Sequence, residues 1–313
     1  MRALVARTLD GPDAIELVET AVPEPGPGQI RIAVAAAAVN PVDVATAGGA
    51  LQRLGLTAAR EQYGLGWDVA GTVDAVGPGV DLPAGTPVIG LSDLLGRPLK
   101  THADQVVLDA TAVAPAPRHL DPVAASTIPL NALTADQALD ALALPAGATL
   151  LVTGAAGAVG GYAVQLARHR ELDVVALVAP ADEGVVREWG ARHVVPRGAD
   201  LPTAVRELVP GGVDGVVDAA LVGVAAQEAV RNGGAFAHLV ATPGPPPLRG
   251  IRVHTVLISA DGERLRRIVG LAEAGVVRTR VAGVHALEDA AAAYRKTAAG
   301  GLRGRLVLVP STP

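Results

Sequence analysis

One stretch decides the fold: Leu150-Leu-Val-Thr-Gly-Ala-Ala-Gly-Ala-Val-Gly-Gly-Tyr-Ala-Val-Gln-Leu-Ala167. Its start predicts a short buried strand over Thr149–Val152, and its end predicts a helix. Between them, Gly154, Gly157 and Gly160 predict a tight turn, because glycine has no Cβ to keep a ligand or a strand at a distance. The helix N-terminus offers unpaired N–H groups that favour a phosphate. Taken alone, this Gly-x-x-Gly-x-x-Gly spacing also fits glycines that serve packing only.

Strands and helices alternate on both sides of this stretch. The predicted strands are Thr149–Val152, Val174–Val178, His193–Val195, Gly215–Asp218, Ala235–Val240 and Val253–Ile258. The predicted helices are Asp121–Ala143, Gly160–Arg168, Asp182–Trp189, Pro202–Val209, Gly223–Val230 and Gly262–Ala274. Repeated βα units are typical of an α/β fold with a doubly wound parallel sheet and right-handed crossovers. A glycine turn after the first strand lies where such a sheet binds its ligand.

The N-terminal part has a different character, with many short strands separated by Gly and Pro. The predicted strands are Ala3–Ala6, Ile15–Glu19, Gln29–Val39, Trp67–Val76, Pro87–Leu91 and His102–Leu108. This spacing is typical of a small β-barrel-like domain. The tail after Arg280 returns to strands around a helix over Leu287–Ala298. We therefore expect a first domain of residues 1–121, rejoined by 280–313, and a second domain of residues 122–279.

Composition narrows the function classes. Of 313 residues, 50% are hydrophobic but only 2% are aromatic, so the core is built from Ala, Val and Leu. The net charge of -5, without a long basic run, argues against nucleic acid and anionic membranes as partners. The absence of cysteine excludes disulfides, thiolate metal sites and cysteine nucleophiles, and it fits a cytoplasmic location. No stretch resembles a signal peptide or a membrane span of about 18 apolar residues.

Several motifs, in order along nearly the whole chain, together resemble one family. They are Pro23-Glu-Pro-Gly-Pro-Gly-Gln29, Val39-Asn-Pro-Val-Asp43, Gly66-Trp-Asp-Val-Ala-Gly-Thr-Val73, Val76-Gly-Pro-Gly79, Ile128-Pro-Leu-Asn-Ala-Leu-Thr-Ala135, Gly154-Ala-Ala-Gly-Ala-Val-Gly160, Leu287-Glu-Asp-Ala-Ala291 and Arg303-Gly-Arg-Leu-Val-Leu308. The set resembles the zinc-independent quinone oxidoreductases, the zeta-crystallin-like branch of the medium-chain dehydrogenase/reductase superfamily.

The resemblance implies a GroES-like β-barrel domain, a Rossmann domain and a substrate site in the cleft between them. It implies hydride transfer from NAD(P)H to a small-molecule quinone or activated enone. It also implies a homodimer joined through the Rossmann sheets, with Ile251–Ile258 as the pairing strand.

The same resemblance assigns site residues. Asn40 would contact the nicotinamide ribose or the substrate, and Thr134 would hydrogen-bond the cofactor, so both are candidates for catalysis. A turn-forming Asn40 and a helix-interior Thr134 that bonds back to a carbonyl are the structural alternatives. The remaining candidates for cofactor binding are Gly154, Ala155, Ala156, Gly157, Ala158, Val159, Gly160, Arg197, Asp218, Ala219, Leu239, Val240, Ala241 and Arg303.

A zinc site is not expected. A catalytic zinc needs about three His, Cys or acidic ligands. Trp67 and Asp68 stand where zinc-dependent relatives carry a His-Glu pair. The seven histidines are scattered along the chain, and we interpret each as a surface or edge residue rather than a ligand. Asp43 is interpreted as a helix cap and Asp68 as structural.

The sequence leaves two alternatives: NADP(H) or NAD(H) as the cofactor, and redox or non-redox chemistry. Ala179 and Ala181, followed by Asp182, lack the cation that would bind a 2′-phosphate, whereas Arg197 could supply one. NADP(H) is therefore favoured only slightly over NAD(H). Because other family motifs are altered, a non-redox cyclisation or addition on an enone, with an absent or structural cofactor, is an alternative function. A non-catalytic binding protein is a further alternative.

Overall fold

The computed structural model describes residues 1–310, which form two compact units. The first unit contains Met1–Leu130, Ser259–Gly275 and the chain from Thr279 onward, and the second contains Asn131–Ile258 and Val276–Arg278. Of the residues expected in the second domain, 122–130, 259–275 and 279 belong to the first unit.

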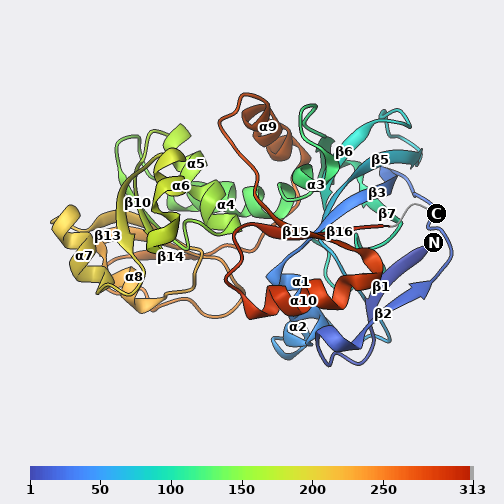
Figure 1. Ribbon diagram of the computed structural model, residues 1–313, viewed down its shortest axis with the longest axis horizontal. Helices are drawn as coiled ribbons and strands as arrows, with labels where there is room; N and C mark the ends of the chain where they lie inside the picture. The colour runs from blue at the N-terminus through green and yellow to red at the C-terminus, as the bar shows by residue number, and fades with distance from the viewer. Residues whose placement is uncertain (311–313) are drawn as a thin grey trace. The chain divides into compact units, whose positions relative to one another are not determined.

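The second unit is a six-stranded, all-parallel sheet flanked by helices (Figure 1). Its strands are β9 Thr149–Thr153, β10 Asp173–Val178, β11 Ala191–Pro196, β12 Val213–Asp218, β13 Val230–His238 and β14 Arg252–Thr255. Its helices are α4 Pro129–Leu142, α5 Ala158–His169, α6 Glu183–Glu188, α7 Leu201–Leu208 and α8 Val224–Glu228, with a 3-10 turn over Pro180–Asp182. The strand order β11-β10-β9-β12-β13-β14 confirms the predicted doubly wound fold.

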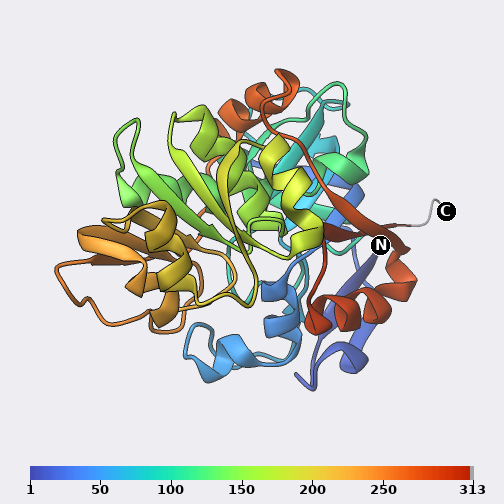
Figure 2. The same cartoon turned by 60° about the vertical axis from the view of Figure 1, so that its left-hand side comes forward.

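Alternating apolar residues explain how this sheet is covered. Leu151, Val216 and Phe236 point to one face and pack with residues of α7 and α8, including Val205 and Ala226. Figures 1 and 2 show α7 and α8 together on one side of the sheet, away from α5. A sheet covered on both faces needs continuous Val-rich and Leu-rich strands, which is what the sequence supplies.

The helix predicted over Asp121–Ala143 is wrong as a single element. The structure has α3, Pro122–Ala125, and then α4, which begins at Pro129. Proline has no N–H to continue a helix and disfavours a helical residue before it, so the chain breaks over residues 126–128. The predicted cap is correct, since Asp121 accepts a hydrogen bond from the Ala124 amide at 2.8 Å.

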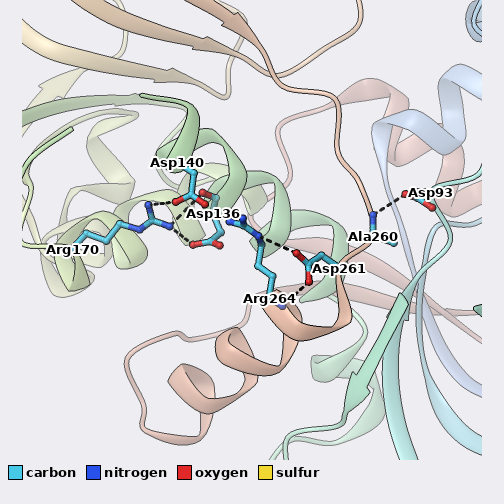
Figure 3. Close-up of polar contacts among 7 residues, drawn as sticks. All are labelled: Asp93, Asp136, Asp140, Arg170, Ala260, Asp261 and Arg264. Carbon is cyan, nitrogen blue, oxygen red and sulfur yellow. Dashed lines mark hydrogen bonds and ion pairs between the residues drawn. The ribbon is translucent and has the colours of Figure 1, made fainter. Parts of the chain in front are cut away.

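Arg170 ties α4 to the end of α5. Its guanidinium pairs with the Asp136 carboxylate, and it pairs with Asp140 at 2.6 Å (Figure 3). These contacts hold α4 beside the helix that follows the glycine turn.

The first unit is built mainly from antiparallel strands. They are β1 Arg2–Ala6, β2 Ile15–Glu19, β3 Gln29–Val39, β4 Tyr63–Gly64, β5 Asp68–Val76, β6 Pro87–Leu91, β7 Gln105–Asp109, β8 Val113–Pro115, β15 Val281–Ala286 and β16 Arg305–Val309. Its helices are α1 Pro41–Ala47, α2 Ala50–Arg53, α3, α9 Gly262–Glu273 and α10 Ala290–Ala299, with 3-10 turns over Pro12–Ala14, Ala110–Ala112 and Leu287–Asp289.

The C-terminal segment rejoins this unit as predicted, because β16 pairs antiparallel with β3. Helix α9 also belongs here: Asp93 accepts a hydrogen bond from the Ala260 amide at 2.7 Å, and Asp261 caps α9 (Figure 3). Among residues 1–310, none of the helices combines the length and apolar character needed to cross a membrane.

Candidate functional site

The glycine turn lies at the switch point of the parallel sheet, where β9 is followed spatially by β12. Gly154 directly follows β9 with a φ of 58°, a conformation that favours glycine. Gly157 is the N-cap of α5, and its amide donates to the Gly154 carbonyl at 2.8 Å. A Cβ on Gly160 would lie 2.2 Å from that carbonyl oxygen, so Gly160 is required for packing.

The front of this turn fits a dinucleotide pyrophosphate. Gly157 brings no side chain to cap the helix, and a Cβ there would meet only the Gly154 oxygen, at 3.1 Å. The first-turn amides of Ala158, Val159 and Gly160 have no acceptor within the helix. A 12-residue helix therefore presents its N-terminal amides, with no side chain in the way, to an anion. Ala155 and Ala156 are buried behind the turn.

Asp218, at the end of β12, holds the turn rather than presenting a free carboxylate. Its Oδ1 accepts from the Thr153 hydroxyl at 2.6 Å and from the Val222 amide at 2.9 Å. Its Oδ2 accepts from the Gly223 amide at 2.8 Å. These bonds position Ala219 beside the glycine turn, so Asp218 acts on a ligand through the backbone that it fixes.

Leu239, Val240 and Ala241 follow β13 directly, at the same carboxyl edge of the sheet. Leu239, Val240 and Ala241 are all half-buried, as wall residues of a binding site would be. His238, the last residue of β13, is 6% exposed, and its Nδ1 has no hydrogen-bond partner among residues 1–310.

Arg197 lies at the end of β11, and its amide donates to the Val178 carbonyl at 2.6 Å. This bond places Arg197 next to the end of β10, where the ribose of a dinucleotide is bound in this fold. Its exposed side chain has no ion pair or hydrogen bond within residues 1–310. In contrast, Glu183 is paired with Arg187 at 2.8 Å. The nearby acidic charge is therefore partly neutralised, while Arg197 is available to an anion.

In the first unit, Asn40 belongs to a buried polar cluster. Its side-chain amide donates to Asp68 at 2.7 Å, and its backbone N–H donates to Asp43 at 2.8 Å. Asp43 caps α1 as predicted and also accepts from the Gly66 amide at 3.0 Å. Asp68 accepts from the Leu130 amide at 2.6 Å. All three polar side chains are completely buried.

Burial dominates the electrostatics of this cluster. It raises the pKa of Asp68 to about 7, although the Leu130 amide and Asn40 favour the charged form. Burial also raises the pKa of Asp43. A carboxyl group with a pKa near neutrality can exchange a proton under physiological conditions.

The expectation that every histidine lies at the surface or an edge is wrong for His102 and His238. His102 is 1% exposed, with Nδ1 2.8 Å from the Tyr294 hydroxyl and Nε2 3.1 Å from the Ala38 carbonyl. Burial lowers the pKa of His102 and so favours its neutral form. The tertiary contacts of α10 and β3 enclose it, which its local sequence could not indicate.

Lys100 is the functional candidate that sequence reasoning missed. It is 4% exposed, and its Nζ lies 3.9 Å from the centroid of the Trp67 ring. Burial lowers the pKa of Lys100 to about 7, opposed by the charges of Asp43 and Asp93. Its position after Arg97-Pro-Leu gives no local signal of burial.

Thr134 and Arg303 are the two remaining predicted residues. Thr134 is 6% exposed inside α4, in the second unit, and its hydroxyl is not part of the glycine turn. Arg303 precedes β16 in the first unit, which does not contain the turn. Their proposed contacts with the cofactor stay predictions.

Zinc does not fit the residues at the expected position. Both carboxylate oxygens of Asp68 accept hydrogen bonds, and the indole of Trp67 has no lone pair to offer a metal. Within residues 1–310, no three His, Cys, Asp or Glu side chains are grouped closely enough to hold a metal ion.

Comparison with known families agrees with the two-part architecture. The alcohol dehydrogenase GroES-like domain family matches residues 26–118, and the zinc-binding dehydrogenase family matches residues 189–308. The chain belongs to the medium-chain dehydrogenase/reductase superfamily. It is thus a member of a superfamily of NAD(P)H-dependent oxidoreductases.

Curated proteins with several different descriptions are similar to the chain. A spectinabilin polyketide synthase system protein of Streptomyces orinoci is 34% identical over 90% of this chain, which spans only 13% of that protein's length. The NADPH-dependent alkenal/one oxidoreductase of Arabidopsis thaliana is 29% identical over 89% of this chain and 71% of its own. The chloroplast envelope quinone oxidoreductase homolog of the same plant is 29% identical over 96% and 95%.

Solved structures of the superfamily superimpose on nearly the whole chain. An NAD-dependent alcohol dehydrogenase has a TM-score of 0.88 at 29% identity, over 99% of both chains. A mycobacterial protein solved with NADPH has a TM-score of 0.83 at 26% identity, over 99% of this chain and 100% of its own.

Proposed function

We propose that this oxidoreductase transfers a hydride from NAD(P)H to a quinone or an activated enone without the help of zinc. The observation that carries the proposal is the glycine turn before α5, whose uncapped first-turn amides fit a pyrophosphate. Relatives named as alkenal/one and quinone oxidoreductases support this acceptor class.

We propose NADP(H) in preference to NAD(H). The exposed Arg197 guanidinium, next to the end of β10, suits a 2′-phosphate, because arginine binds phosphate through two parallel N–H bonds. Pairing of Glu183 with Arg187 reduces the repulsion that an acidic residue would exert there. An NADPH-dependent relative and a neighbour solved with NADPH favour the same choice.

Reduction without zinc needs polar groups of the chain to stabilise charge on the acceptor oxygen. The bound dinucleotide supplies the hydride, and negative charge then develops on the carbonyl oxygen of the enone or quinone. Hydrogen-bond donors held in a water-poor environment stabilise such charge strongly. Asn40, which the resemblance places at the ribose or the substrate, is completely buried, and its side-chain amide donates to Asp68 and to the Ala38 carbonyl. It would therefore act through the cluster that it positions.

We also propose a homodimer joined through β14. This strand pairs only with β13 among residues 1–310, so its outer edge offers free backbone groups. Leu257, just after β14, is 61% exposed, and Leu248, before it, is 56% exposed. Light scattering after gel filtration should give twice the chain mass, and Leu257→Asp should shift the protein to a monomer. A monomeric wild-type protein would overturn this assembly.

The function is tested by calorimetric titration of the purified protein with NADPH and with NADH. Oxidation of the bound nucleotide by 1,4-naphthoquinone and by 3-penten-2-one is then followed by its absorbance. We expect tighter binding of NADPH and oxidation by at least one acceptor. Absence of binding by either nucleotide would refute the reductase function and favour non-redox chemistry on an enone.

A further inference from the structure

The chain has two lysines, and their environments are opposite. Lys296, on α10, is exposed, with its Nζ 3.5 Å from His285. Lys100 is 4% exposed and lies over the Trp67 ring. Within residues 1–310, its Nζ makes no hydrogen bond.

An enclosed ammonium group without a hydrogen-bond acceptor is costly, because burial removes its water without replacing it. Attraction to the face of Trp67 recovers only part of that cost. Thr101, the next residue, is 0% exposed, and its Oγ1 also lacks a hydrogen-bond partner among residues 1–310. Two consecutive residues thus hold polar atoms that the protein leaves unsatisfied. Such groups are expected where a bound molecule or water completes the bonding.

The backbone around Lys100 is held firmly. The Gly64 amide donates to the Arg97 carbonyl at 2.8 Å, and the His102 amide donates to the Leu65 carbonyl at 2.9 Å. A Cβ on Gly64 would lie within 2.7 Å of the Leu99 backbone, so the two segments are in direct contact. Lys100 is therefore placed by backbone bonds on both sides rather than by a mobile loop.

Charges on several elements influence the protonation of Lys100. Burial lowers its pKa to about 7, and Asp43 of α1, Asp93 after β6 and Asp68 of β5 oppose that effect. Arg97 lowers the pKa further. Lys100 in turn lowers the pKa of the buried His102. Lys100 is thus linked electrostatically to the cluster that holds Asn40.

We infer that Lys100 is a catalytic acid of the proposed reductase, whose Nζ binds the carbonyl oxygen of the enone or quinone and donates a proton to it. This inference rests on the proposed function and adds the group that completes the reaction.

A hydride from NAD(P)H forms a C–H bond at the β-carbon of the enone, and an electron pair moves to the carbonyl oxygen. The Nζ–H bond of Lys100 breaks as the O–H bond forms, giving an enol that tautomerises to the ketone. The neutral amine then takes a proton from water. The enone is reduced, and NADPH is oxidised to NADP⁺.

The first test compares Lys100→Met and Lys100→Arg with Lys296→Met, using NADPH with 3-penten-2-one and with 1,4-naphthoquinone. General acid catalysis typically contributes about 10²–10⁴-fold. We expect Lys100→Met to lower kcat at least about 100-fold and to change NADPH affinity less than about twofold. The wild-type kcat should fall as pH rises above about 7, since the proton is lost. Lys100→Arg should lose this pH dependence, and Lys296→Met should behave as wild type.

The second test does not depend on turnover. Protein carrying ¹³C-labelled lysine gives signals from only two side chains, and Lys296→Met identifies the Lys100 signal. That signal should titrate near pH 7, and the saturated ketone 2-pentanone should shift it selectively. Titration above about pH 10, as for a free lysine, would overturn the inference. Wild-type kcat in folded Lys100→Met would overturn it as well.

The two proposals can fail separately. A wild-type protein that binds NADPH but reduces neither acceptor would refute the proposed function, whatever the Lys100 titration gives. Turnover in the wild type with an unchanged rate and pH profile in both Lys100 variants would refute the inference alone. Folding of each variant is checked by thermal unfolding followed by circular dichroism.

Discussion

The two units prepare for chemistry in contrasting ways. The carboxyl edge of the parallel sheet is built from small residues and backbone amides, with Gly154, Gly157 and Gly160 at its centre. The buried cluster of the first unit instead gathers ionisable side chains, including Asp68 and Lys100. The first arrangement suits recognition of an anion by geometry. The second suits proton exchange, because burial brings pKa values toward neutrality.

A binding site made of backbone groups is specified by one short stretch of sequence, whereas a site made of buried charges depends on residues far apart in the chain. A glycine turn requires one short stretch with a fixed spacing. The Asn40–Asp68 hydrogen bond joins residues 28 positions apart, and the His102–Tyr294 contact joins residues 192 positions apart. Substitutions in the glycine turn should therefore change nucleotide affinity, whereas substitutions in the buried cluster should change the stability of the protein and its dependence on pH.

The largest effect is expected from Gly157→Asp. Its carboxylate would stand against the pyrophosphate at the N-terminus of α5, so dinucleotide affinity should fall more than about 100-fold, or about 3 kcal/mol. Calorimetry with NADPH and NADH measures the loss. Gly270→Asp in α9, where a Cβ meets nothing within 4 Å, is the control and should bind normally. Unchanged affinity in Gly157→Asp would remove the turn as the nucleotide site.

A smaller effect, on stability, is expected from Asp68→Asn. Burial raises the pKa of Asp68 to about 7, so its protonated form is favoured in the folded protein. Its contribution to stability is complete below about pH 4 and is lost as pH rises through about 7. Asparagine resembles the protonated acid but does not titrate. The free energy of unfolding should therefore depend less steeply on pH in the variant, by up to about 1.4 kcal/mol per pH unit.

Urea unfolding between pH 4 and 8 measures that slope. In the variant, a single amide oxygen faces two donors, Asn40 and the Leu130 amide, so a loss of about 2 kcal/mol at pH 5 is expected. Asp74→Asn, on the same strand but at the surface, is the matched control and should keep the wild-type slope. An identical slope in Asp68→Asn would mean that Asp68 does not titrate in this range.

The smallest effect is expected from Arg197→Ala. Loss of the guanidinium should weaken NADPH about tenfold, equivalent to about 1.4 kcal/mol, and should leave NADH nearly unchanged. Competitive titration with both nucleotides measures the ratio. Arg192→Ala removes another exposed arginine of the same segment, one that pairs with Asp173, and should not alter the preference. Equal losses of NADPH and NADH in Arg197→Ala would remove its role in 2′-phosphate binding.

Much of the second unit could be predicted because its signals are periodic. Each of its six predicted strands overlaps an observed strand, and the glycine turn lies after the first of them. The break before Pro129 was missed because the apolar residues on either side continue the helical pattern. The backbone chemistry of proline outweighed that pattern.

In the buried cluster of the first unit, the sequence predicts only part of the arrangement. Asp43 could be recognised as a cap, since it lies three residues after Asn40 at the start of α1. Nothing near Lys100 or His102 in the chain marks them as buried, because the residues that enclose them come from β3, α1, α10 and the segment before β5.

The glycine turn, the doubly wound sheet and the return of the C-terminal segment can be predicted from the sequence alone, because spacing, period and turn residues act over short distances. The folded protein alone reveals that Asp218 is engaged in holding the turn, that Arg197 is unpaired among the described residues, and that Lys100 is enclosed against Trp67. The physical reason is that hydration and charge pairing depend on atoms from distant segments, and these set the pKa of a side chain.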